Sequence, residues 1–119
     1  PSASGRHSSG ESDNLQNGAD GVGLYQARPA AFPAGTPATA VRLLDALVYG
    51  TNDAEDTGLL SALISSDATA PQRVQVDEGA TSALSTTQSI QRCADGARDG
   101  RRFRAAEPTP GELNTVSCP

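Results

Sequence analysis

The sequence is poor in the side chains that usually build a large core or a reaction centre. Its 119 residues contain no Trp, no Met and no Lys, one His, two Phe and two Tyr. Hydrophobic residues make up 36% of the chain, and many of them are alanine. A chain of this length supports one domain, and a small domain with so few large apolar side chains is marginally stable. We therefore expect a covalent link or a partner to add to its stability.

Catalytic residues of the common classes are also missing. The single histidine, His7, lies in a polar segment, so a nucleophilic Ser or Cys has no credible base. Ser61 lies in G-L-L-S-A-L, which is not the G-x-S-x-G turn of a serine nucleophile. The paired carboxylates fall in predicted loops, away from any apolar pocket that would raise a pKa. These pairs are Asp53 with Glu55, and Asp77 with Glu78. We therefore predict that the chain is not an enzyme and uses no cofactor.

One acidic run could in principle hold a cation. Asn52, Asp53, Glu55 and Asp56 offer oxygen ligands of the kind that Ca²⁺ prefers. The run lacks the D-x-D-x-D-G spacing and the late Glu of a calcium loop. We expect a solvated loop there and no metal site.

The charge balance argues against a nucleic acid partner. The net charge is −5, and a negative chain gains little from phosphate backbones. Aromatic side chains for base stacking are scarce as well. The basic residues cluster in one place, at Arg98, Arg101, Arg102 and Arg104. This cluster is a candidate site for an acidic protein or an envelope polymer, and an ordinary solvated strand is the alternative.

Two cysteines, Cys93 and Cys118, are the only thiols in the chain. An even count without metal-type spacing favours a disulfide in an oxidising compartment, and two free thiols are the alternative. A bridge would close a loop of about 26 residues and add about 3.5 kcal/mol in the chain-entropy model. For so sparse a core, that contribution could decide whether the domain folds.

The first twenty residues contain mainly Ser, Gly, Asn and charged side chains. Such a segment buries too little apolar surface to offset its ordering entropy, so we expect residues 1–20 to form a flexible leader. Residues 21–119 are then the folded domain. No stretch is long and apolar enough to span a membrane, and no signal-peptide pattern is present. Because Pro1 is not a natural initiator, we expect a processed or truncated start, which allows for a removed export signal.

Periodicity and capping signals predict the elements of the first half. Residues 21–28 are typical of a short strand. Thr36 is a good N-cap before Pro37, and the spacing of apolar residues predicts a helix over 38–49. Gly50 provides its stop. Residues 58–64 are apolar throughout, and periodicity cannot decide there between a strand and a helical turn.

The second half predicts two strands, a helix and a last strand. The strands are expected at 73–77 and 80–84, joined by a tight turn at 77–79. A capping box of Ser85 with Gln88 predicts a helix over about 86–97. Residues 101–105 are expected to form the last strand, with Phe103 pointing inward. The expected fold class is therefore α+β: a small two-layer domain with two helices on one face of a three- to four-stranded sheet.

The stretch from Val41 to Leu63 resembles the GerMN domain, a family that typically shows an apolar helix ending L-L-x-G, an acidic segment and G-L-x-S-A-L. The V-x-V strand, the following turn and a Q-x-I-x-C-like element continue the resemblance over roughly residues 22–118. The usual Pro after the first glycine is absent here. The matching residues are Leu43, Leu44, Leu47 and Gly50 in the first part, and Gly58, Leu59, Ser61, Ala62 and Leu63 in the second.

This resemblance implies an extracytoplasmic module of spore-associated proteins or actinobacterial lipoproteins, a family without established enzymatic activity. Membrane contact would then come only through a lipid-anchored N-terminal cysteine that the sequence lacks. We expect a non-enzymatic accessory domain that binds a protein partner of the cell envelope, with a sensor-kinase ectodomain as one candidate. The alternative is a self-associating structural or assembly module, a homo-oligomer held through sheet edges or helix faces.

Overall fold

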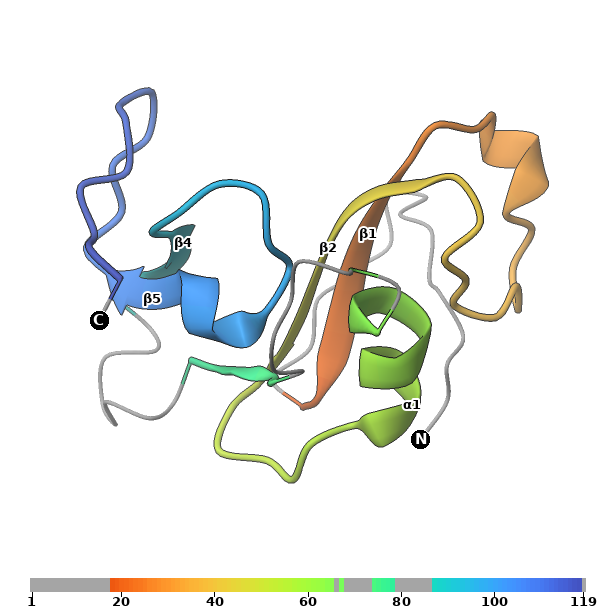
Figure 1. The fold of residues 1–119 in the computed structure, drawn as a ribbon, viewed down its shortest axis with the longest axis horizontal. Helices are drawn as coiled ribbons and strands as arrows, with labels where there is room; N and C mark the ends of the chain where they lie inside the picture. The colour runs from red at the N-terminus through yellow and green to blue at the C-terminus, as the bar shows by residue number, and fades with distance from the viewer. Residues whose placement is uncertain (1–17, 66, 68–73, 79–86, 119) are drawn as a thin grey trace.

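The computed structural model describes residues 18–65, 67, 74–78 and 87–118, and within them the strands form two small sheets (Figure 1). The first sheet has the order β1-β2-β3, and the second pairs β4 with β5. The strands are β1 (Asp20–Tyr25), β2 (Leu43–Gly50), β3 (Val76–Asp77), β4 (Ser89–Arg92) and β5 (Phe103–Ala106). The helical segments are η1 (Pro29–Ala31), α1 (Thr57–Leu59), η2 (Leu60–Ile64) and η3 (Gly100–Arg102).

The first sheet is built around β2, which pairs antiparallel with β1 on one side and parallel with β3 on the other. Val22 lies opposite Leu47, and Leu24 lies opposite Asp45. The register then shifts, because Tyr25 pairs with Leu43 and leaves Leu44 without an opposite residue. This β-bulge bends the far end of the β1–β2 hairpin and adds to its twist.

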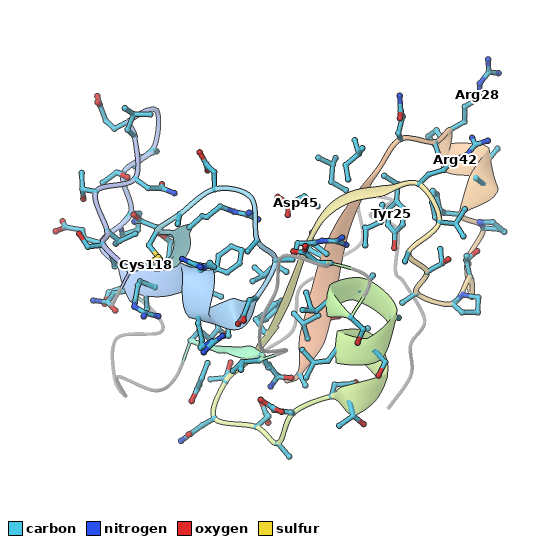
Figure 2. All side chains as sticks on the ribbon, in the orientation of Figure 1. Tyr25, Arg28, Arg42, Asp45 and Cys118 are labelled. Atoms are coloured by element: carbon cyan, nitrogen blue, oxygen red, sulfur yellow. A yellow bond between two sulfur atoms is a disulfide. The ribbon has the colours of Figure 1, made fainter. Side chains whose placement is uncertain are left out.

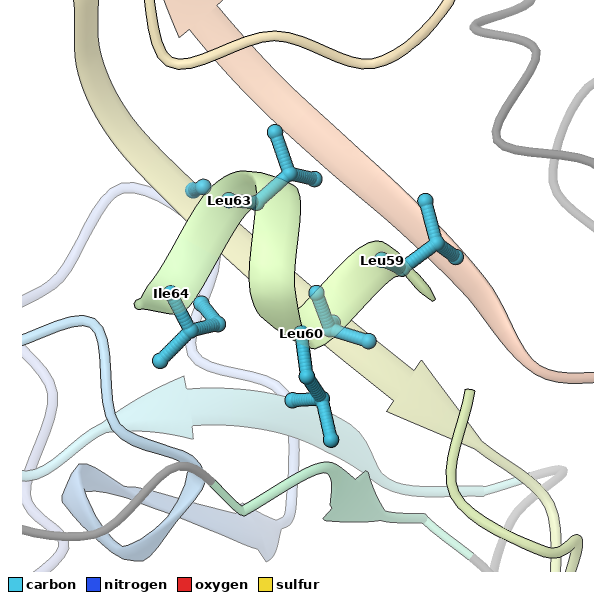
Figure 3. Close-up of a cluster of buried hydrophobic side chains, with 6 residues drawn as sticks. Leu59, Leu60, Leu63 and Ile64 are labelled. Carbon is cyan, nitrogen blue, oxygen red and sulfur yellow. The ribbon is translucent and has the colours of Figure 1, made fainter. Parts of the chain in front are cut away.

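A short helical segment covers one face of this sheet. Asp56 caps it, since the Leu59 backbone N–H donates to Asp56 Oδ1 at 3.0 Å, and α1 continues directly into η2. Leu59, Leu60, Leu63 and Ile64 pack against Ala46 and Val48 of β2 and form the main buried cluster (Figure 3). A Cβ on Gly21 would lie 3.2 Å from Leu63 Cδ1, so the helix sits close over β1. The sequence left residues 58–64 undecided, and the structure makes them helical.

The predicted helix over 38–49 is wrong, because most of this stretch forms β2. Ala46 and Val48 join the cluster under α1 and η2, whereas Leu47 and Tyr49 contact a second cluster. Successive residues that serve opposite faces have the period of a strand. Arg42 has a φ of 61°, outside the helical region, so a helix could not run through it. Thr36 and Pro37 therefore do not begin a helix.

The predicted helix over 86–97 is also wrong within its described residues. Residues 89–92 form β4 instead, and the chain turns after it, with Gly96 at a φ of 97°. Ile90 reaches the second cluster of Tyr49, Val76 and Phe103, so this short strand is fixed by tertiary contacts. The expected arrangement of two helices on one sheet face is therefore replaced by one short helical segment and two small sheets in the described part of the chain.

Other predicted elements fare differently. The first strand is confirmed as β1 over residues 21–25. The last strand is confirmed as β5 over residues 103–105, with Phe103 buried, whereas residues 101 and 102 lie in η3. The strand expected at 73–77 is ordered as β3 only over its last two residues. Residue 73, the strand expected at 80–84 and most of the leader, residues 1–17, lie outside the described residues.

The disulfide between Cys93 and Cys118 is confirmed, with a Cα–Cα distance of 5.2 Å. It ties the last described residue to the end of β4. The Asn114 side-chain amide also donates to the Arg92 carbonyl at 3.1 Å, so the C-terminal segment is held against β4 at two points. The bridge thus fastens the second sheet, which contributes only Phe103 and Ile90 to the small apolar cluster that it shares with the first sheet.

Candidate protein-binding face

The face of the first sheet that lies opposite α1 is only partly covered. Phe103 of β5 packs near Leu47 and Tyr49 on this side, but it does not reach across β1. An open groove of about 310 Å³ remains between the two sheets. Its lining, named here the β1 face, consists of Val22, Leu24, Asp45, Ala46, Leu47, Arg92 and Phe103.

The apolar side chains of β1 are unusually exposed for residues of a sheet. Val22 is 44% exposed and Leu24 is 62% exposed. Leu44, the bulge residue, and Val41 are exposed near the same end of the hairpin. Apolar surface gathered in one place commonly marks an interaction site, whereas single exposed leucines carry no such meaning.

Arg92 forms the polar wall of the groove. Its guanidinium donates to both carboxylate oxygens of Asp45, at 2.7 and 2.8 Å. The same group lies over the Phe103 ring, 4.7 Å from the ring centre, and donates to the Ala97 carbonyl at 3.1 Å. A two-oxygen ion pair and a stacked ring fix this side chain in one orientation. The groove therefore combines a rigid polar wall, formed by Arg92, with an apolar floor.

The groove residues were not singled out in the sequence. Arg92 bonds Asp45 across 47 positions of the chain, and Val22 faces Leu47 across the strand pair. The sequence did predict Val22 and Leu24 as part of a strand, but it assigned Asp45 and Leu47 to a helix. An alternation of apolar and polar residues through Leu44, Asp45 and Ala46 was the one signal that could have revealed the shared face.

The predicted arginine cluster serves the fold in two of its four members. Arg98 donates its backbone N–H to Asp67 at 2.8 Å and its guanidinium to the Leu63 carbonyl at 2.8 Å. The Arg101 guanidinium bonds the buried carboxylate of Asp99 at 3.0 Å. The Arg98 contacts hold the loop before η3 against the end of η2, and both guanidiniums have partners within the chain.

The other two members are Arg102, which is half-buried, and Arg104, whose guanidinium donates to the Phe103 carbonyl at 2.7 Å. A binding role for the cluster as a whole stays a prediction.

The polar side chains of the acidic loop between β2 and α1 form hydrogen bonds within the fold. Asp53 accepts the Thr51 backbone N–H at 2.8 Å, and Asp77 accepts that of Asn52 at 2.9 Å. Asp56 is the N-cap described above. No group of three or more His, Cys, Asp or Glu side chains suited to a metal ion occurs among the residues that the structure describes.

None of the helices within the described ranges has the length and apolar character needed to cross a bilayer. The Cys93–Cys118 bridge is compatible with a place outside the cytoplasm, where disulfides persist. Comparison with protein families, curated proteins and solved structures found no significant match for this chain.

Proposed function

We propose that this chain is a non-enzymatic domain that acts outside the cytoplasm and binds a protein partner through the β1 face. The observation that carries the proposal is the exposure of Val22 and Leu24 on a strand whose other face is packed under a helix. Full burial of a large apolar side chain contributes roughly 1.5–3 kcal/mol, and a partner that covers the exposed part of Val22 and Leu24 would recover a fraction of this for each of them.

The β1 face has the mixed character of a specific contact surface. Val22 and Leu24 offer exposed apolar area along the β1 side of the groove. Asp45, whose side chain is 45% exposed, keeps acceptor capacity next to this area although it pairs with Arg92. A partner residue with an apolar body and a polar tip fits such a groove, because its tip would meet the fixed ion pair.

The proposed location rests on the disulfide and on the resemblance to the GerMN domain. Oxidising compartments preserve a bridge such as Cys93–Cys118, which closes 25 positions of the chain. In that setting the partner would be an envelope protein, and a sensor-kinase ectodomain is the first candidate. A lipid-bearing cysteine upstream of residue 1 would bring the domain to the membrane.

The proposal is tested by comparing two leucine substitutions of the same kind. Leu24→Glu places a charge on the β1 face, and Leu113→Glu places it on an 87% exposed leucine of the C-terminal segment. The wild type and both variants are immobilised and exposed to an envelope extract, and bound proteins are quantified by mass spectrometry.

We expect a defined protein to bind the wild type and Leu113→Glu equally. Its recovery on Leu24→Glu should fall by about tenfold or more, as for a central contact residue. A set of bound proteins that is the same for all three chains would contradict the proposal.

A further inference from the structure

The outer edge of β1 is unpaired in the described part of the chain, where β1 contacts only β2 in the sheet. Two hydrogen bonds reveal which backbone groups point outward. The Gln26 N–H donates to the Arg42 carbonyl, toward β2, whereas the Gly21 N–H donates to the side chain of its neighbour Asp20. Because backbone groups alternate along a strand, the odd-numbered residues of β1 direct their N–H and C=O away from β2.

Ala46 of β2, which lies opposite Gly23, also directs its backbone groups away from the partner strand. The Ala46 N–H donates to the Asp45 side chain and not to β1. The pair of Gly23 and Ala46 is therefore a non-bonded pair of the ladder, and Gly23 offers both of its backbone groups to the outside. Gly23 is exposed, and a glycine has only backbone to expose.

This edge lacks the devices that usually prevent strands from pairing between molecules. Charged side chains, prolines and a covering loop are the common ones. The stretch from Gly21 to Leu24 contains neither charge nor proline. The bulge lies one step beyond it, between Leu24 and Tyr25. Four residues of flat, apolar edge are thus available for pairing.

We propose that the β1 strands of two copies of this chain pair antiparallel about a two-fold axis at Gly23. Gly23 exchanges both backbone hydrogen bonds with Gly23 of the second copy. Gly21 does so with Tyr25 of the second copy, and its N–H gives up the bond to the Asp20 side chain on pairing. Val22 then lies opposite Leu24 of the second copy. That pair is non-hydrogen-bonded, the geometry in which opposite side chains approach most closely. The two first sheets become one continuous sheet.

A second copy fits this edge because the strand is complementary to itself. Asp20 begins β1, and Arg28 follows its end by three positions. Antiparallel pairing brings the acidic end of one strand to the basic end of the other. Figure 2 shows Arg28 and Arg42 together at the η1 end of the hairpin. Neither forms an ion pair with another described residue, so both are available to Asp20 of the second copy.

The pairing goes beyond the proposed function, since it concerns the edge of β1 and not its face. Dimerisation through the edge and partner binding through the face can be distinguished by two charge substitutions. Val22→Lys and Leu24→Glu each place a charge opposite an apolar side chain of the second copy. Each variant alone should therefore weaken dimerisation by about tenfold, measured by sedimentation velocity over a wide concentration range.

Combining the two substitutions should restore the dimer. In an equal mixture of the single variants, or in the double variant, the introduced lysine and glutamate face each other across the axis. The double variant has lost the apolar β1 face, so it should dimerise and still fail to bind the envelope partner. Leu113→Glu serves as the matched control and should dimerise like the wild type.

Two results would overturn the pairing: a wild-type chain that stays monomeric at the highest concentration, or single variants whose defect the mixture does not repair. Hydrogen exchange on the wild type tests the same idea without any variant. The amides of Gly23 and Tyr25 should become protected only as the concentration rises, while those of Val22 and Leu24 are protected throughout. Equal protection of all four at every concentration would also overturn it.

Discussion

The two faces of the β1–β2 hairpin use the same strands in opposite ways. On the face under α1 and η2, β1 contributes Gly21 and Gly23, whose lack of side chains lets Leu63 and the Tyr25 ring approach. On the other face, the same strand presents Val22 and Leu24 to solvent. A strand that served only to fill a core would carry its large apolar residues on the covered side. In β1 only Tyr25 packs on the covered side, and the proposed binding role of the open side rests on this distribution.

This difference has a thermodynamic counterpart. Residues of the covered face should determine whether the chain folds, and residues of the β1 face should determine what it binds. Substitutions ordered by their effect on stability should therefore fall in nearly the reverse order for binding.

The largest loss of stability is expected from the covered face. Ile64 is completely buried among the leucines of the main cluster. Ile64→Ala should lower the free energy of unfolding by about 4 kcal/mol, because it removes buried apolar surface and leaves a cavity. Urea denaturation measures this value, with Val41→Ala, an exposed site, as control. A loss as small as that of the control would show that the cluster is not the main core.

The disulfide should come next. Replacing both Cys93 and Cys118 by serine frees a loop of 25 positions and should reduce stability by about 3 kcal/mol. The β4–β5 sheet and the Arg92 wall of the groove should loosen first, because the bridge joins the end of β4. Amide exchange of β4 before and after reduction checks this order. Faster exchange in β1 than in β4 after reduction would argue against it.

A smaller loss of stability is expected when Arg92, the polar wall of the groove, is substituted. Arg92→Gln removes the ion pair with Asp45 and the contact over the Phe103 ring. Since both charged side chains are partly exposed, we expect a cost of about 1 kcal/mol. Thermal unfolding measures this cost. The charge-conserving Arg92→Lys should recover only part of the stability, because one ammonium cannot bond Asp45, donate to the Ala97 carbonyl and stack on the Phe103 ring at the same time.

The smallest effect on stability belongs to the β1 face itself. Leu24→Glu should change the free energy of unfolding by no more than about 0.5 kcal/mol, as for an exposed position. The same substitution should lower the recovery of the partner by about tenfold or more. If it instead destabilises the chain as much as Ile64→Ala, Leu24 is a core residue and the contrast between the two faces disappears.

The sequence predicted the parts of the fold that depend on local signals or on covalent chemistry. The strands at β1 and β5 and the Cys93–Cys118 bridge are of this kind. It failed at β2, where L-L-D-A-L-V-Y fits a helix and a strand equally well. Thr36 and Pro37 supply convincing helix-start signals, yet pairing with β1 decides the outcome. Local propensity is a weak prior that tertiary pairing can override.

The candidate site was missed for the same reason. Once residues 43–50 are taken as a helix, Asp45 and Leu47 no longer share a face with β1. Arg92 lies in the other segment that was mistaken for a helix, and it reaches Asp45 only because both are strands. Of the four arginines in the predicted binding cluster, Arg98 and Arg101 have their guanidiniums bonded to Leu63 and Asp99. A run of like charges does not reveal which members have partners.

The exposure of the β1 face in the isolated chain is the claim on which the account depends most. Methyl relaxation by an inert, soluble paramagnetic agent measures it directly in dilute solution. We predict that the methyl groups of Val22 and Leu24 relax nearly as fast as those of Leu113, and that those of Ile64 stay unaffected. Methyl groups of Val22 and Leu24 that are shielded as well as Ile64 in the dilute chain would contradict the account.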